Sequence, residues 1–228
     1  MKKILIIVLF VLLSMSFVAC GNTSGEKATE QSIEEYSQEA QGNLLDYNKS
    51  VFTQYIENAT QNALALLPYC DSEDDYSLVQ DWHQCVVLYV CTEQIYNYSY
   101  EQYLLLENHN SYYSSQKSYL MNQILSIEAK YNRLIQSAPE YIEITVGRRD
   151  QNLINRRIAS LRAECQSETA YYYSQINALD SQYSNENANM NAYRESYTSA
   201  KTLMAQLEEK FETLDAQATE MKNSYASA

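Results

Sequence analysis

Residues 172–225 read YYSQINALDSQYSNENANMNAYRESYTSAKTLMAQLEEKFETLDAQATEMKNSY. Apolar or aromatic side chains recur along them at alternating steps of three and four. The recurring positions are Tyr172, Ile176, Leu179, Tyr183, Glu186, Met190, Tyr193, Tyr197, Ala200, Met204, Leu207, Phe211, Leu214, Ala218, Met221 and Tyr225. All of these except Glu186 are apolar or aromatic, whereas only 46% of the whole chain is hydrophobic. Such spacing is typical of a coiled-coil seam. It predicts one long helix, over about residues 150–226, that packs against another helix.

A second stretch repeats the same rhythm from Leu78 to Ala138. Four polar residues interrupt its apolar and aromatic seam: Thr92, Ser99, Asn110 and Lys117. The preserved phase predicts one helix over about residues 76–138. The alternative is a break near Asn110, because the surrounding residues 107–115 are rich in Asn and Ser, which favour caps and turns over helix interiors.

An earlier helix is expected over about residues 33–67, where apolar side chains recur at steps of three and four from Ile33 to Tyr55. Pro68 should end it, because a proline pushes the preceding residue out of the helical region. Residues 141–146 read as extended chain and Gly147 as a turn. The whole chain contains only four Gly and two Pro, which is too few to separate the strands of a sheet protein.

These features predict an all-α fold. The favoured architecture is an elongated antiparallel helical bundle, or coiled coil, of three long helices that form a single domain over residues 33–228. The alternative, with the break near Asn110, is a shorter bundle of four or five helices.

The start of the chain has the three parts of a secretory signal. Lys2 and Lys3 give it a positive charge, residues 4–13 form an unbroken apolar run, and small residues precede Cys20. We expect a signal peptide over residues 1–19. The polar residues 20–32 read as a flexible tether between this signal and the helices.

The segment Phe17-Val18-Ala19-Cys20 resembles the lipobox of bacterial lipoproteins, although Phe17 stands where the usual residue is Leu. The resemblance covers only residues 1–21. It implies cleavage by signal peptidase II before Cys20 and attachment of a diacylglycerol to the Cys20 sulfur, hence a protein held on a membrane and facing outside the cytoplasm. The alternative is an ordinary cleaved signal followed by an incidental cysteine.

The chain is acidic, with a formal net charge of −13 that becomes −15 once Lys2 and Lys3 are removed. Such a charge opposes binding to nucleic acid. The same charge opposes general attraction to anionic lipid, but five arginines gather around the second predicted turn: Arg148, Arg149, Arg156, Arg157 and Arg162. We expect either that they contact lipid headgroups as a membrane-proximal basic cluster, or that they form a solvated face paired with nearby glutamates.

The residues that could carry chemistry do not converge. Four further cysteines, Cys70, Cys85, Cys91 and Cys165, are an even number and leave a disulfide open, although Cys85 and Cys91 are too far apart along one helix. His83 and Cys85 do not share a helix face, so no metal site is expected. No catalytic or cofactor-binding set is recognised either. Acidic residues 71–75 are expected to cap the next helix rather than bind calcium.

Tyrosine is abundant, with 22 residues, and nine of them lie off the predicted seams. Exposed tyrosines suit protein or glycan contacts. The sequence therefore favours a lipid-anchored scaffold or protein-binding module of a bacterial envelope. An extracytoplasmic holdase or assembly factor is the first alternative, an enzyme the second, and partnership with another copy of the chain stays open.

Overall fold

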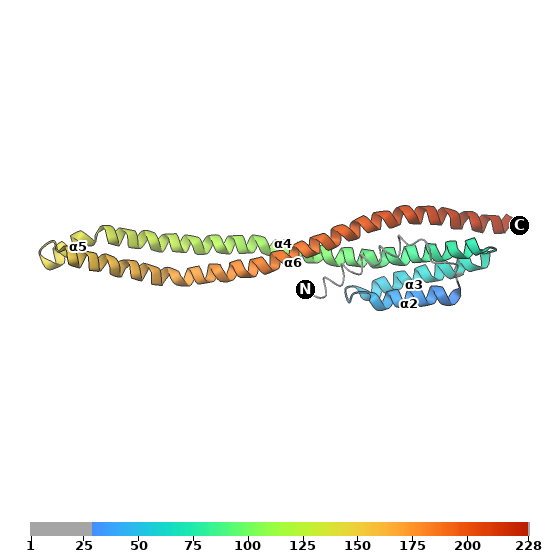
Figure 1. The fold of residues 1–228 in the computed structure, drawn as a ribbon, viewed down its shortest axis with the longest axis horizontal. Helices are drawn as coiled ribbons and strands as arrows, with labels where there is room; N and C mark the ends of the chain where they lie inside the picture. Colours follow the sequence, from blue (N-terminus) through green and yellow to red (C-terminus); the bar gives the residue numbers. More distant parts are fainter. Residues whose placement is uncertain (1–28, 228) are drawn as a thin grey trace. The chain divides into compact units, whose positions relative to one another are not determined.

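The computed structural model describes residues 29–227, and every regular element in that range is helical (Figure 1). The elements are α2 (Glu30–Asn43), α3 (Lys49–Leu66), the short 3₁₀ helix η1 (Leu67–Tyr69), α4 (Glu73–Gln136), α5 (Ala138–Val146) and α6 (Gln151–Ser227). The predicted all-α class is confirmed. The described residues fall into two compact units, the first of residues 29–104 with 191–227 and the second of Leu105–Met190.

The prediction of one helix over residues 33–67 is wrong, because this stretch forms two helices that lie side by side (Figure 1). Helix α2 stops at Asn43, the backbone of Leu44 is extended, and Asn48 takes a left-handed conformation with φ of 48° before α3 begins. Asn is among the few residues other than Gly that tolerate this conformation. Residues 29–227 contain five α-helices, which fits the number given by the alternative architecture.

Gln94 explains why the chain turns at this point. Its side-chain nitrogen donates hydrogen bonds to the carbonyl oxygens of Leu45 (3.0 Å) and Tyr47 (2.6 Å), and its oxygen accepts one from the Leu45 N–H (2.9 Å). Gln94 is 1% exposed. These bonds satisfy backbone groups that the interrupted helix would otherwise leave without partners.

The predicted tether over residues 20–32 extends too far. Thr29 is the N-cap of α2: its hydroxyl accepts the Ser32 N–H (3.0 Å), and the Ser32 hydroxyl accepts the Thr29 N–H (2.9 Å). This reciprocal capping box starts the helix at Glu30, so residues 30–32 belong to α2. Residues 20–28 of the tether lie outside the described range.

Helix α4 is continuous from Glu73 to Gln136, so the alternative break near Asn110 is absent. Asn110 is half-buried and donates to the sulfur of Met190 at 3.2 Å, which gives its amide a partner inside the second unit. The ends of α4 and α6 in this unit run antiparallel, because partners that rise along α4 fall along α6: Tyr113 with Glu186, Lys117 with Asp180, and Tyr131 with Glu168.

The prediction of extended chain over residues 141–146 is wrong, since these residues lie in α5. Pro139 stands in the first turn of this helix, where a missing N–H costs nothing, and Gly147 ends it with φ of 75°. The third predicted helix begins close to its expected start, with Asp150 accepting the N–H groups of Asn152 (3.0 Å) and Leu153 (3.2 Å). The β-branched residues of α5 favour strands only where neighbouring strands exist to pair with them.

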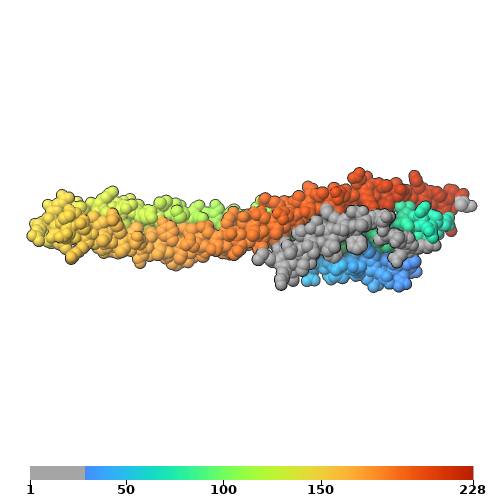
Figure 2. Space-filling view, viewed as in Figure 1, coloured from blue at the N-terminus to red at the C-terminus, as the bar shows by residue number. Residues whose placement is uncertain are grey.

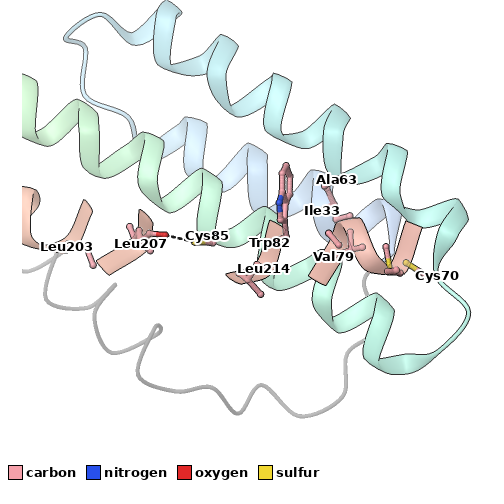
Figure 3. Close-up of a cluster of buried hydrophobic side chains, with 11 residues drawn as sticks. Ile33, Ala63, Cys70, Val79, Trp82, Cys85, Leu203, Leu207 and Leu214 are labelled. Atoms are coloured by element: carbon pink, nitrogen blue, oxygen red, sulfur yellow. Dashed lines mark hydrogen bonds between the residues drawn. The ribbon is translucent and has the colours of Figure 1, made fainter. Parts of the chain in front are cut away.

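The main core of the first unit is a cluster of buried side chains (Figure 3). They come from α2, α3, α4 and α6, and from Cys70 directly after η1. Trp82, Cys85, Leu207 and Leu214 come from the predicted seams. A second stripe on α4 was not predicted and is buried as well: Val79, His83, Val87, Val90 and Gln94. The packing of Val87 and Val90 with Phe52 and Ile56 of α3 shows that this stripe meets the α2–α3 hairpin.

Candidate functional site

One buried polar group joins three helices in the first unit. The Ser37 hydroxyl oxygen of α2 lies 2.6 Å from the Thr60 hydroxyl oxygen of α3 and 3.0 Å from Nε2 of His83 on α4. The Thr60 hydroxyl donates to the carbonyl oxygen of Ile56 at 2.8 Å. Because each hydroxyl has one proton, Thr60 accepts from Ser37, and Ser37 in turn accepts from Nε2–H of His83.

This direction of hydrogen bonding argues against a nucleophile and base pair. A general base must accept the proton of the nucleophile, whereas His83 donates to Ser37 and its unprotonated Nδ1 atom has no hydrogen-bond partner. His83 is 0% exposed and Ser37 is 3% exposed, so no substrate reaches them in this conformation. Burial also lowers the pKa of His83 from 6.5 to about 4. The group therefore serves the packing of α2, α3 and α4.

The cysteines of the described chain are all free thiols: Cys70, Cys85, Cys91 and Cys165. Burial raises the pKa of Cys70 to about 11 and also raises that of Cys85. The Cys85 thiol donates to the carbonyl oxygen of Leu207 at 3.4 Å, shown as the dashed line in Figure 3. Among residues 29–227 no three His, Cys, Asp or Glu side chains gather as a metal site would require.

The acidic turn before α4 is confirmed as a helix cap. Asp75 accepts the N–H groups of Asp71 (3.2 Å) and Ser72 (2.9 Å) and the Ser72 hydroxyl (2.7 Å), while the Ser72 hydroxyl accepts the Asp75 N–H (3.2 Å). These hydrogen bonds, first of all that from the Ser72 side chain, lower the pKa of Asp75. Its carboxylate is committed to the capping box.

A cluster of tyrosines forms the most distinctive surface of the first unit. We call it the tyrosine cluster, and its members are Tyr96, Tyr100, Tyr103 and Tyr197. The Tyr197 ring contacts those of Tyr100 and Tyr103, each at a centroid distance of 5.4 Å. The edge-to-face geometry of these pairs is favourable for aromatic rings. A separate group of three rings, Tyr47, Tyr98 and Tyr193, joins α4 and α6 to the α2–α3 turn.

The tyrosine cluster is buried on one side and open on the other. Tyr103 is 9% exposed, whereas Tyr100 is 40% exposed. The guanidinium of Arg194 lies 5.3 Å from the centre of the Tyr103 ring and donates to its hydroxyl at 3.2 Å. Beside this cluster, burial, followed by the hydrogen bond with Tyr98, raises the pKa of Tyr193 to about 12. The Tyr193 hydroxyl therefore stays a neutral hydrogen-bonding group at physiological pH.

The five predicted arginines come together in the second unit, around the turn between α5 and α6. Arg148 lies 3.6 Å from Asp150, and Arg157 lies 3.6 Å from Glu164. Within the described range, Arg149, Arg156 and Arg162 have no ion pair. Arg148 is thus close to an aspartate and Arg157 to a glutamate.

Sequence reasoning missed the apolar side chains beside these arginines. Tyr141, Ile144 and Val146 of α5 are 57%, 76% and 43% exposed. In Figure 2, the segment that contains α5 lies in the yellow part of the surface. A helical projection of residues 138–146 would have separated Tyr141 and Ile144 from the buried face of Ala138 and Ile142, although not Val146.

The predicted lipid attachment at Cys20 and the predicted signal over residues 1–19 lie outside the described residues. Within residues 29–227, no helix has the length and apolar character needed to cross a bilayer. Comparison with known proteins finds no match to this chain among protein-family models, curated proteins or solved structures.

Proposed function

We propose that this chain is a lipid-anchored scaffold or protein-binding module that faces outside the cytoplasm of a bacterium. The lipobox-like segment ending at Cys20 supports the anchor and the location. Antiparallel pairing of α4 and α6 along their seven-residue seams supports a coiled-coil framework. The proposal includes no catalytic step, no cofactor and no nucleic-acid partner. The partner that it proposes is an envelope protein, and a second copy of the chain stays open as another partner.

The observation that carries the binding role is the tyrosine cluster. Tyrosines are enriched in protein interfaces because their rings supply large contact areas with few rotatable bonds, while their hydroxyls hydrogen-bond at the rim. Tyr96 and Tyr100 stack at 5.9 Å with an interplanar angle of 5°, which holds both rings in place before a partner arrives. A ring already fixed in its bound orientation loses little entropy on binding.

Capture of partners from bacterial membranes tests the binding role, with the intact lipoprotein as bait. Tyr100→Ser is the test variant, and Tyr171→Ser is the matched control, because Tyr171 is an exposed tyrosine of the second unit at 63% exposure. A partner should be recovered with the natural chain and the control, and lost with Tyr100→Ser. Equal recovery with both variants would contradict binding through the tyrosine cluster.

The anchor is tested separately by Cys20→Ser expressed in a bacterium fed with labelled palmitate. The natural chain should carry label and sediment with membranes, and the variant should do neither. An unlabelled natural chain would show that Cys20 is incidental. Suppression of the aggregation of a denatured client, without recovery of a defined partner, would favour the holdase alternative instead.

A further inference from the structure

The exposed side of α5 carries two large apolar side chains that share a face. Ile144 has the largest exposed fraction of the large hydrophobic residues described, and Tyr141, three residues earlier, lies on the same face of this short helix. Single exposed apolar residues are common on protein surfaces, but those that adjoin one another usually mark a contact with something else. We call Tyr141 and Ile144 the apolar tip.

The charge around the apolar tip is opposite to that of the whole chain. Residues 133–162 contain six arginines and three acidic residues, whereas the chain has a net charge of −13. The three arginines without ion pairs, Arg149, Arg156 and Arg162, are all exposed. Their guanidinium groups are therefore available for anions, and planar guanidinium groups bind phosphate with two hydrogen bonds.

We propose that the apolar tip and its arginines bind the surface of an anionic bilayer. Ile144 enters the boundary between headgroups and acyl chains, Tyr141 lies at headgroup level with its hydroxyl in water, and the arginines contact lipid phosphates. Aliphatic side chains flanked by arginines suit such a surface, where apolar burial and attraction to anionic lipid add together. Tyrosine is enriched at this depth in membranes.

An anionic bilayer is favoured as the occupant because its phosphates suit the arginines without ion pairs, and the acyl chains beneath those phosphates suit the exposed Ile144. The inference goes beyond the proposed function. It is also independent of Cys20, because every contact used here lies within residues 137–164.

The test uses flotation of residues 29–227 with vesicles of phosphatidylcholine alone or mixed with phosphatidylglycerol. All the packing contacts and caps given above lie in this segment, and circular dichroism checks that it keeps its helices. We expect binding to the anionic vesicles that weakens as salt is added, and little binding to phosphatidylcholine. Absence of binding to both kinds of vesicle, or equal binding to both, overturns the proposal.

Two sets of variants with matched charge make the test specific. Replacing Arg149, Arg156 and Arg162 with Gln should reduce the partition coefficient at least about ten-fold, since each basic residue near an anionic surface contributes to it. Replacing Lys49, Lys201 and Lys210 with Gln changes the net charge equally and should reduce it less than about two-fold. An equal reduction with both sets would show general charge attraction and overturn the proposal.

The apolar part is tested by Ile144→Gln, with Val51→Gln on α3 as control because Val51 is also exposed, at 43%. Ile144→Gln should weaken vesicle binding several-fold and the control should not. Circular dichroism of both variants checks that the helices are retained. Loss of a protein partner from the membrane pull-down on replacing the three arginines, with no vesicle binding by the natural chain, would assign the tip to that protein instead.

Discussion

His83 donates from Nε2 to the hydroxyl oxygen of Ser37 at 3.0 Å, and neither side chain is accessible to water. The other ring nitrogen, Nδ1, is buried without a partner. Protonation of the ring would place a second N–H and a positive charge where nothing accepts them. The contact between α2 and α4 thus depends on a neutral histidine.

Stability should therefore fall on mild acidification. The pKa of His83 is lowered from 6.5 to about 4 by burial, so the unfolded chain binds a proton at a higher pH than the folded one. The contribution is complete above pH 6.5 and is lost as the pH falls towards 4, by up to about 1.4 kcal/mol per pH unit. His83→Gln keeps a donor to Ser37 but cannot titrate, so urea unfolding should show a smaller loss for it over this range.

His109→Gln is the control for this prediction, because the His109 side chain is 60% exposed and has only a long contact of 3.4 Å with Glu186. Its stability should follow the natural protein from pH 7 to 4. Parallel curves for all three proteins would mean that His83 is not buried as a neutral ring.

Gln94→Ala should loosen the turn between α2 and α3. The variant loses all three hydrogen bonds to Leu45 and Tyr47 and leaves buried backbone groups without partners, at a cost of about 2–3 kcal/mol in the free energy of unfolding. Hydrogen exchange gives the local readout: the Leu45 N–H should exchange faster in the variant.

Gln175→Ala provides the comparison, since Gln175 is exposed on α6. It should leave both the unfolding free energy and the Leu45 exchange rate nearly unchanged. Unaltered exchange at Leu45 in Gln94→Ala would mean that the turn does not need the Gln94 amide.

The free thiols should react in an order set by burial. The thiolate is the reactive form, and burial raises the pKa of Cys70 to about 11 and raises that of Cys85, both of which are also covered by neighbouring side chains. With iodoacetamide at pH 8, half-exposed Cys165 should be alkylated before these two, which should react fully only after unfolding. Mass spectrometry of the digested protein measures each site. Recovery of a peptide linked through Cys85 and Cys165 would contradict the helix pairing described here.

The seams of α4 and α6 could be predicted because their packing repeats. Of the sixteen seam positions given for α6, only Tyr183 and Tyr225 are exposed, and both are tyrosines whose hydroxyls gain from contact with water. Leu203 and Ser196 are buried without belonging to that seam. A single-seam pattern cannot indicate them, because it assumes one facing helix.

The α2–α3 turn was missed because its apolar spacing continues in phase across the break. Leu44 is the eleventh residue after Ile33, as an uninterrupted helix would also place it. The partner that stabilises the turn, Gln94, is distant in sequence and polar, so no local pattern points to it. The buried stripe from Val79 to Val90 was a usable signal, since a helix with two apolar faces needs partners on both.

The candidate surface at α5 could be predicted only in part. The arginines can be recognised from composition alone. The apolar tip can be recognised only if residues 138–146 are taken as a helix, and the β-branched residues 144–146 favoured extended chain instead. Pro139 near the start and Gly147 just past the end are the usual signals of helix boundaries. They are stronger evidence for a helix than the β-branched residues are for a strand.

In the second unit, α4 and α6 each carry one heptad seam. Helix α5 and a turn of four residues, from Gly147 to Asp150, connect the two helices. Deleting seven residues from α4 and the seven that face them on α6 would leave both seams in step. The length of the second unit can therefore change one heptad at a time, through inherited insertions or by design. The arginine-flanked end stays the same.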